Sequence, residues 1–534
     1  MKNNYSDLHC HNHMRAHFHM QRRKEIFKKE GKFSPWSVVP SNFKKNNKGV
    51  NSAAYSQTDL VRAWNSGLRL TFNSLYPLER NFVKGKKISL KEDLLNAVVA
   101  GVTSHLFFFR DLIQMLAMKI PKVTVDFFQS DQYDYWESFQ EEYVFVALDS
   151  GNRITQNQIL ATRAEIRRLE LDKNTKSYFH QSYVAKNACY RIPKDRIELS
   201  ESLADQNEIT MVLTIEGAHA FGSDTASPEQ VGLRIKEIKT NKTKWKYPFF
   251  FITFGHHFDN RLVGHAHSIP DIGKLIFDQR NRMNEGIPAS GITILRQLLS
   301  LNTSNKRDIS QGYRILIDVK HMSAKSRRDY YIQIVRPALA DGDVIPVIAS
   351  HCGYSGRKTL QDHITDQDLE TDNWKDKEAG LFNAWNINMC DEDIEIILQT
   401  KGLFGLSFDQ RILGLEKKEN KSSRNSITLI WQNIEGILKA SYRTKLDKTI
   451  QNRIWTCLTI GTDFEGLIDP VNPYSSVFDF AKLERDLINL IDAQRILPNQ
   501  SHLAFIRDRG HVVQLVRDFC YNNAEAFVQE NYPV

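Results

Sequence analysis

The feature that most constrains the fold is a repeated alternation of hydrophobic runs and amphipathic stretches along the 534-residue chain. Most of the hydrophobic runs are almost continuously apolar, as expected for strands that are buried on both faces of a parallel sheet. The eight runs cover residues 5–11, 68–77, 209–219, 248–257, 313–321, 344–352, 402–409 and 457–464. Amphipathic segments lie between them, such as residues 227–240, 290–301, 326–342 and 391–402. Eight such alternations predict an α/β fold of the (β/α)8 TIM barrel type.

The connection between the second and third runs is far too long for a single helix. We therefore expect residues 1–85 to form the first part of the barrel, with strands 1 and 2, and residues 86–205 to form a helical insertion. Residues 206–534 would complete the barrel and add C-terminal helices. The strongly apolar residues 94–120 include a histidine, an arginine and an aspartate, which favours a buried or amphipathic helix over a membrane span. Two polar stretches predict long loops after the sixth and seventh strands, namely residues 361–380 and 411–426.

Composition and charge exclude several classes of protein. The chain is 41% hydrophobic and 25% charged, which is ordinary for a globular protein. Its six cysteines follow no framework spacing, which indicates free thiols, and no signal peptide is visible, so we expect a cytoplasmic protein. The net charge of +8 is spread along the chain and no nucleic-acid-binding motif accompanies it, so we expect neither a nucleic acid nor a membrane as partner.

Residues that bind divalent metals stand at the ends of six of the eight predicted strands. Active sites of (β/α)8 barrels lie at the carboxyl ends of the strands, and imidazole and carboxylate groups are the ligands that zinc and similar ions prefer. The sequence therefore predicts a metal site at this end of the barrel. Its candidate residues are His9, His11, Glu216, His256, His257, His321, His351 and Asp463. Three further histidines lie beyond the first strand, where we expect loop or supporting roles, namely His13, His17 and His19.

Seven short motifs follow one another along the chain. They are DLHCH at 7–11, IEGAH at 215–219, FITFGHHFDN at 251–260, LIDVKHMS at 316–323, PVIASHCG at 346–353, GTDFEG at 461–466 and YNNAEAF at 521–527. In order and spacing they resemble the renal, or membrane, dipeptidase family of the amidohydrolase superfamily. IEGAH is similar to that family's Glu-Gly-Gly-His segment, and GTDFEG is similar to its Gly-Ser-Asp-Phe-Asp-Gly segment. The resemblance covers most of the chain apart from the predicted insertion.

The resemblance implies a site for two divalent metal ions, for which we expect Zn²⁺. His9 and His11 would bind one ion, His321 and His351 would bind the other, and Glu216 would bridge the two. Two cations that share a hydroxide lower the pKa of water from ~15.7 to about 7 or below. The function that the resemblance implies is therefore hydrolysis of an amide or peptide bond by this bridging hydroxide.

The resemblance also gives roles to residues beside the metals. Asp463 would orient the hydroxide, accept its proton and pass it to the leaving nitrogen. His256, or its neighbour His257, would donate a hydrogen bond to the developing oxyanion, where fixed donors help most. The substrate would be a small molecule or a short peptide, and the sequence leaves a homodimer open.

Two departures from the family concern the metal site and the substrate. The family usually has an aspartate where His11 stands, and a histidine there lowers the negative charge of the site. The family also carries an arginine that grips the substrate carboxylate, and Ile387 falls at about that position. Arg357 is our first candidate for a substitute cation, with Lys358 and Arg411 as others. Another amidohydrolase substrate is therefore an alternative, such as an acyl-amino acid, a lactone or a deaminated base. A non-catalytic metal-binding barrel is the other alternative.

Overall fold

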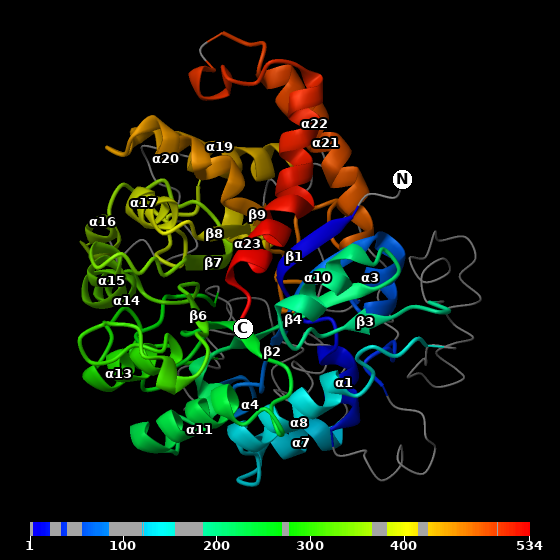
Figure 1. Cartoon of the computed structure of the whole chain (residues 1–534), viewed down its shortest axis with the longest axis vertical. Coiled ribbons are helices and arrows are strands. Elements are labelled where there is room, and N and C mark those ends of the chain that lie inside the picture. The colour runs from blue at the N-terminus through cyan, green and yellow to red at the C-terminus, as the bar shows by residue number, and fades with distance from the viewer. Residues whose placement is uncertain are drawn as a thin grey trace, which may run out of the picture.

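Nine parallel strands form a single sheet in the computed structural model of the chain (Figure 1). The structure describes residues 4–21, 34–39, 56–84, 120, 122–154, 185–269, 277–365, 382–414, 426–498 and 500–533. The helix expected over residues 94–120 lies outside these residues except for Ile120, and parts of both expected long loops lie outside them as well.

Eight of the strands follow one another around a barrel, in the order β1-β2-β4-β5-β6-β7-β8-β9. Each of the eight hydrophobic runs contains one of these strands, so the prediction of a (β/α)8 barrel is confirmed. The short strand β3 pairs with β4 outside this path. The strands are β1 (Tyr5–Cys10), β2 (Leu68–Leu75), β3 (Tyr190–Arg191), β4 (Ile209–Glu216), β5 (Phe249–Thr253), β6 (Leu316–Asp318), β7 (Val347–Cys352), β8 (Leu403–Leu406) and β9 (Leu458–Ile460).

The barrel closes where β9 returns to β1. A parallel bridge joins Cys10 to Phe464, and the Asp463 N–H donates to the His9 carbonyl at 2.9 Å. Below this bridge, the Asp7 carboxylate accepts hydrogen bonds from the backbone N–H and the hydroxyl of Thr462. Because these contacts join the first and last strands, they fix the end of β1 against the loop after β9.

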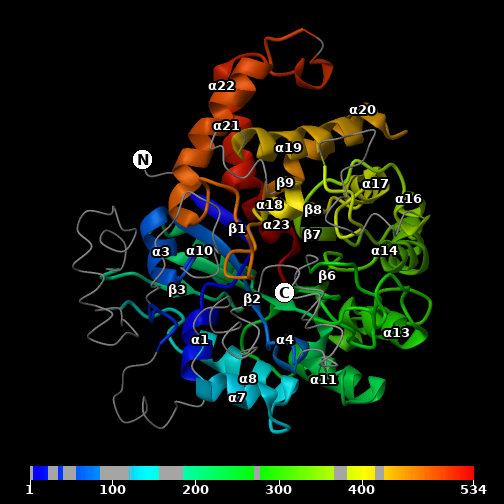
Figure 2. The same cartoon turned by 180° about the vertical axis from the view of Figure 1, so that it is seen from behind.

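Helices surround the barrel, as the opposite views in Figures 1 and 2 show. Before β4 these are α1 (Met14–Met20), α3 (Leu60–Ser66), α4 (Asn81–Lys84), α7 (Lys122–Gln129), α8 (Tyr135–Ala147) and α10 (Arg196–Ala204). The helices between β4 and β8 are α11 (Pro228–Thr240), α13 (Ala289–Leu298), α14 (Ala324–Tyr330), α15 (Arg336–Ala340), α16 (Leu360–Thr365) and α17 (Asp391–Gln399). After β8 come α18 (Gln410–Leu413), α19 (Ser426–Arg443), α20 (Lys448–Asn452), α21 (Phe480–Gln494), α22 (Arg509–Arg517) and α23 (Asn523–Asn531).

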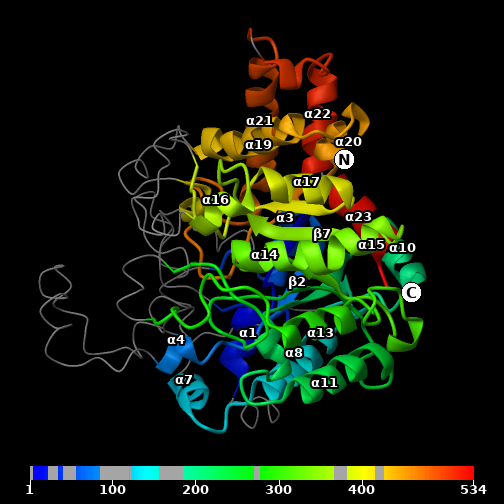
Figure 3. The same cartoon turned by 90° about the vertical axis from the view of Figure 1, so that its left-hand side faces the viewer.

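The C-terminal helices seal and extend the barrel. Large apolar residues of β2, β4 and β5 pack in one buried cluster with Phe527 and Val528 of α23 and with Tyr532. The Tyr532 hydroxyl donates to the Pro193 carbonyl at 2.8 Å. Figure 3 shows α21 and α22 extending together away from the strands.

The described part of the predicted insertion 86–205 contains α7, α8, β3 and α10. Helix α8 is amphipathic and buries Trp136, Phe139 and Tyr143 in the main core, where they pack near Trp245 and Phe249. The domain boundaries at 86 and 205 remain a prediction.

The six cysteines are all buried and none forms a disulfide, as expected for free thiols. In the part of the chain that the structure describes, no helix has both the length and the apolar character needed to cross a membrane.

Candidate metal centre

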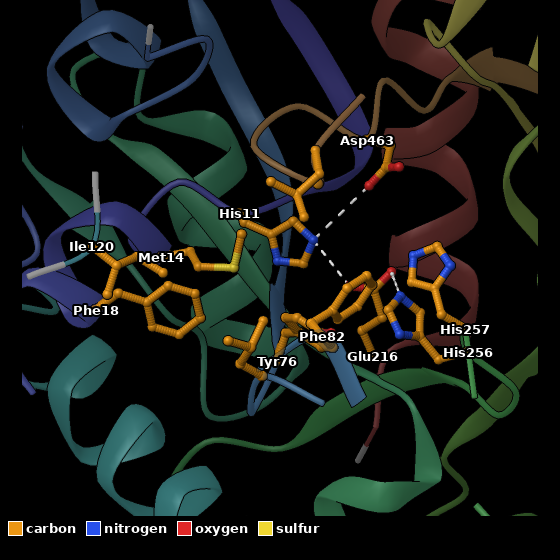
Figure 4. Close-up of a pocket in the computed structure, with 13 residues that line it drawn as sticks. His11, Met14, Phe18, Tyr76, Phe82, Ile120, Glu216, His256, His257 and Asp463 are labelled. Atoms are coloured by element: carbon orange, nitrogen blue, oxygen red, sulfur yellow. Dashed lines mark ion pairs between the residues drawn. The ribbon is translucent and has the colours of Figure 1, made fainter. Parts of the chain in front are cut away.

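A cluster of imidazoles and carboxylates lies at the carboxyl ends of the strands, with Glu216 at its centre (Figure 4). Glu216 is the last residue of β4. Its Oε1 lies 3.1 Å from His9 Nε2 and 3.3 Å from His256 Nε2, and its Oε2 lies 3.1 Å from His11 Nε2. One buried carboxylate therefore contacts three imidazoles, which come from the end of β1 and from the loop after β5.

Asp463, His351 and His321 extend the cluster. Asp463 Oδ1 lies 3.7 Å from His9 Nε2, and Asp463 Oδ2 lies 3.9 Å from His351 Nε2. The Nε2 atoms of His321 and His351 are 3.3 Å apart. The structure thus brings all of the metal-ligand candidates to one place, although they are spread from residue 9 to residue 463.

Among the described residues, two groups have ligand atoms that all lie within 4.8 Å of one another. The first group is His9, Glu216, His351 and Asp463, and the second is His256, His257 and His321. These groups divide the residues differently from the two sets that the family resemblance implies, because His321 and His351 fall into separate groups.

The backbone bends sharply to present Asp463. Asp463, Glu465 and Leu467 all adopt left-handed conformations, with φ of 62°, 74° and 65°. A Cβ on Gly466 would lie only 2.1 Å from Asp463 Oδ1, so any larger residue at this position would displace the Asp463 carboxylate. Three left-handed residues that are not glycine store strain, which is typical of backbone held in place at a functional site.

In four histidines the Nδ1 atom contacts a neighbouring polar group, which leaves the Nε2 atom facing the cluster. Nδ1 of His11 contacts the Ser74 carbonyl at 2.9 Å, and Nδ1 of His351 contacts Ser350 Oγ at 2.8 Å. In the same way, Nδ1 of His256 contacts Glu79 Oε2 at 2.5 Å and Nδ1 of His257 contacts Ser268 Oγ at 2.7 Å. Metal-binding histidines are oriented by such partners on the nitrogen that does not bind the metal.

Burial and mutual charge set the protonation of the site. Burial lowers the pKa of His257, His321 and His351 well below the ordinary histidine value, which favours the neutral imidazole that binds metals. His256 differs because Glu79 and Glu216 overcome the effect of burial and raise its pKa to about 10.

The two acids of the cluster respond in opposite directions. Burial would raise the pKa of Glu216, but the charges of His256, His9 and His11 hold it well below its ordinary value. Burial, reinforced by the charge of Glu216, raises the pKa of Asp463 well above its ordinary value. Glu216 is therefore a fixed anion, whereas Asp463 is suited to gain and lose a proton.

The residues fit divalent cations. The buried Nε2 of His11 makes no hydrogen bond to any described residue although it faces the Glu216 carboxylate. This nitrogen and the carboxylate oxygens around it converge on one point, where a cation would satisfy all of them. Imidazole nitrogens and carboxylate oxygens in this number are the donor set that proteins use for zinc and related ions.

A narrow pocket, partly open to solvent, lies beside His11, Glu216 and Asp463. The pocket wall around the metal-ligand candidates is polar and includes His256 and His257. The rest of the described lining is largely apolar and consists of Met14, Phe18, Tyr76, Leu78, Phe82, Ile120, Gly466 and Leu467.

The sequence analysis did not single out Glu79, and it gave no role in the site to Lys320. Glu79 is buried, holds His256 and accepts a hydrogen bond from the Phe258 N–H. Lys320 is also buried, its Nζ makes no hydrogen bond to any described residue, and its charge lowers the pKa of His321 and His351. A lysine directly before His321 was visible in the sequence, but nothing local to Glu79 marks it as a partner of a residue 177 positions away.

None of the three histidines His13, His17 and His19 belongs to the two groups of candidate metal ligands among the described residues. His13 Nε2 pairs with Glu142 Oε1 of α8 at 2.7 Å, and the same carboxylate accepts from the Tyr76 N–H at 2.9 Å. His17 and His19 lie on α1. His13 therefore links the end of β1 to the predicted insertion.

The position of the missing arginine is apolar. Ile387 is buried with Ala266, Trp385 and Ile412. The guanidinium of Arg327 donates to the carbonyls on both sides of Ile387 and pairs with Asp393, and both charged side chains are fully buried.

Two of the residues that we expected to replace the missing arginine make contacts unrelated to the pocket. Arg411 pairs with Asp409 at 2.5 Å. Arg357 is not among the described residues that line the pocket, and its charge contributes to lowering the pKa of His363. Its proposed contact with a substrate remains a prediction.

No protein-family model matches the sequence, and no curated protein matches it. A metallo peptidase from Rhodobacter sphaeroides, solved with a phosphinate mimic of the dipeptide L-Ala-D-Ala, is 12% identical with a TM-score of 0.47, and the match covers 100% of both chains. The dipeptidase AC, a metallo peptidase of family M19, is 12% identical with a TM-score of 0.48, again over 100% of both chains. The probable dipeptidase PvdM from Pseudomonas aeruginosa is 10% identical with a TM-score of 0.42 over 96% of this chain and 98% of its own. Likeness at this level assigns no activity or substrate to this chain.

Proposed function

We propose that the chain is a metal-dependent hydrolase of an amide or peptide bond, similar to dipeptidases, and that it uses two divalent ions, with Zn²⁺ first. The observation that carries the proposal is the Glu216 carboxylate, whose oxygens lie 3.1 Å from both His9 Nε2 and His11 Nε2 and 3.3 Å from His256 Nε2. A buried acid in contact with three imidazoles at the mouth of a barrel is an arrangement that a pair of cations would stabilise.

Glu216 would contribute to both ions, with His9 and His11 on one side. His321 and His351, whose Nε2 atoms lie 3.3 Å apart, would bind the second ion. Cations bound there would supply an activated water molecule and polarise the scissile carbonyl. The partner groups on Nδ1 of His11 and His351 support this assignment, because they orient the Nε2 atoms without competing for them.

Asp463 would accept the proton of the attacking water and return it to the leaving nitrogen. Burial and Glu216 raise its pKa, which supports this role because a carboxylate with a raised pKa holds a proton more readily than an ordinary one does. The left-handed loop and Gly466 would hold the carboxylate in place while the proton moves.

A second candidate, hydrolysis of an acylated amino acid, is favoured by the apolar part of the pocket. Met14, Phe18 and Phe82 line the cavity together with the metal-ligand candidates and would bind an apolar acyl group better than a free ammonium group. Ile387 in place of an arginine also removes the family's means of binding a carboxylate. The six buried free thiols support a cytoplasmic location for either activity.

The test is to purify the protein, remove its metals with a chelator, and reload it with Zn²⁺, Mn²⁺ or Co²⁺. We expect about two ions per chain and hydrolysis of a dipeptide or an acyl-amino acid that disappears with the chelator and returns with the metal. Glu216→Gln is the control, since its amide cannot serve as a shared anionic ligand and should weaken both ions together. A protein that binds no metal after reconstitution would contradict the proposal.

A further inference from the structure

A broad cleft lies at the amino-terminal end of the barrel strands, opposite the metal centre. Its volume is about 1020 Å³, and its lining includes Arg69, the second residue of β2, and Asn207, which lies shortly before β4. Leu70 is in register with Thr210, whereas Glu216 ends β4. At about 3.3 Å per residue, roughly 20 Å of strand separates this cleft from the Glu216 carboxylate. The cleft is therefore separate from the candidate metal centre.

Arg69 supplies a buried positive charge to this cleft. It is only 9% exposed, and its Nε and Nη1 donate to the carbonyls of Gln206, Trp64 and Leu68 at 3.0–3.2 Å. No carboxylate of a described residue forms an ion pair with Arg69, and its Nη2 makes no hydrogen bond to a described residue. The guanidinium thus keeps a donor and an uncompensated charge, which suit a carboxylate or a phosphate.

The rest of the lining adds a second cation, an acid and several amides. Arg517 Nε lies 3.7 Å from Glu484 Oε1, and Glu484 Oε2 accepts a hydrogen bond from the Tyr5 hydroxyl at 2.8 Å. Glu484 is the only acid among the described lining residues, so with Arg69 and Arg517 the lining has a net positive charge. Five of the described lining residues are asparagine or glutamine, whose amides can both donate to a ligand and accept from it.

Two aromatic side chains give the cleft apolar surface. The Cζ atom of Arg69 lies 4.6 Å from the centroid of the Trp64 ring, and Tyr521 also lines the cleft. Stacking on the indole ring helps to hold the guanidinium in one orientation. A cleft that combines apolar surface with a few polar groups is typical of sites for organic molecules. The lining therefore suits an organic anion better than a bare inorganic ion.

We propose that this cleft is a second ligand site, in which Arg69 and Arg517 bind a small organic anion with a phosphate or carboxylate group on a ring-containing body. The two arginines hold the anionic group, and the amides and aromatic rings contact the rest of the molecule. Because the cleft lies at the other end of the strands from Glu216, this site does not depend on the proposed hydrolysis.

Isothermal titration calorimetry of the full-length protein with AMP, phenylacetate and adenosine tests the proposal. We expect AMP or phenylacetate to bind with one molecule per chain, and adenosine, which has no anionic group, to bind at least about 10-fold more weakly than AMP. Arg69→Gln should weaken binding of the anion by at least about 10-fold, because a hydrogen bond between two charged groups is lost. Arg485→Gln is the matched control, since this exposed arginine of α21 does not line the cleft.

The metal centre could also bind an anion, so the same titration is made with Glu216→Gln. This variant should bind the anion as tightly as wild type does. Loss of binding in Glu216→Gln would place the anion at the metal centre and overturn the proposal. Absence of binding by both AMP and phenylacetate, or wild-type affinity in Arg69→Gln, would overturn it as well.

Should Arg69→Gln fail to fold, Arg517→Gln tests the same site, because the Arg517 side chain is 53% exposed. We expect it to weaken binding of the anion by about 10-fold, and an unchanged affinity contradicts the proposal. Tighter binding of AMP than of phenylacetate would identify the ligand group as a phosphate, and the reverse would identify a carboxylate. Binding of either anion to a chain that hydrolyses no substrate would refute the proposed function and leave this site standing.

Discussion

Asp463 is held by contacts that do not depend on its own charge. Its N–H donates to the His9 carbonyl at 2.9 Å, its φ is 62°, and Gly466 makes room for its carboxylate. An isosteric substitution should therefore change the chemistry of the side chain without moving the loop.

We expect Asp463→Asn to lower kcat by about 10²–10⁴-fold, because an amide cannot accept the proton of the attacking water. Metal content should stay close to wild type, since His9, His11 and Glu216 are untouched. Steady-state kinetics and elemental analysis of the same preparation measure both quantities. A variant that keeps more than about a tenth of the wild-type kcat would show that Asp463 is not the proton acceptor.

The apolar surroundings of Ile387 lead to a prediction about whether the substrate needs a free carboxylate. A free carboxylate is best bound by a bidentate arginine, and each hydrogen bond to a charged group contributes roughly 1.5–3 kcal/mol. Because Ile387 packs in an apolar cluster, we expect dipeptides and their C-terminal amides to have similar kcat/KM. A preference of about 100-fold or more for the free acid, lost in Arg357→Ala or Arg411→Ala, would restore an ordinary dipeptide as the substrate.

Sequence reasoning found the metal-ligand candidates because each stands at the end of a strand, where the barrel fold gives it a place. Glu79 has no such mark, since it follows Pro77 in an irregular segment and meets His256 only through the tertiary fold. The pairing of His13 with Glu142 was hidden for the same reason. Residues that support ligands, unlike the ligands, follow no periodicity that a sequence reveals.

At the scale of elements, a buried ion pair joins α14 to α17. Arg327 Nε lies 2.9 Å from Asp393 Oδ1, and both side chains are fully buried. Arg327 also donates to the Met322 carbonyl at 3.0 Å, directly after His321. The pair therefore anchors the segment that carries one of the proposed metal ligands.

Arg327→Met should lower the free energy of unfolding by about 3–5 kcal/mol, because it leaves the Asp393 carboxylate buried without its cation. Arg328→Met on the same helix is the control, and it should change stability by less than about 0.5 kcal/mol because Arg328 lies near the surface. Urea denaturation of both variants gives the comparison. Equal effects of the two substitutions would mean that the buried pair has no special role in stability. Adding Asp393→Leu to Arg327→Met should recover much of the lost free energy of unfolding, because no unpaired charge is then buried.

The strands were predictable in order but not in length. The expected run 313–321 contains a strand of only three residues, Leu316–Asp318, and the run 457–464 contains only Leu458–Ile460. Both strands end before the functional residue, because His321 and Asp463 take left-handed conformations with φ of 64° and 62°. Hydrophobicity continues past the strand because these turns are buried, so the pattern alone cannot show where pairing stops.

At the scale of the whole molecule, the barrel and the metal centre depend on each other. The ligand candidates come from the ends of six strands, and the contact that closes the barrel, between Cys10 and Phe464, lies beside His9, His11 and Asp463. In the sequence, hundreds of residues separate His9 and His11 from Asp463, so the unfolded chain does not hold them together. Cations would therefore bind the folded state far more tightly than the unfolded state, and this difference stabilises the barrel.

We expect removal of the metals with a chelator to lower the melting temperature by several degrees, and reloading with Zn²⁺ to restore it. Each ion present at 100 times its Kd contributes about 2.7 kcal/mol to the free energy of unfolding, so two sites together contribute about 5 kcal/mol. Differential scanning calorimetry at several free Zn²⁺ concentrations measures the shift, which should grow with the logarithm of the concentration. Glu216→Gln is the control, because a chain without the shared carboxylate should respond much less to Zn²⁺. If wild type and Glu216→Gln shift equally, the stabilising ions bind elsewhere on the chain and not at the ends of the strands.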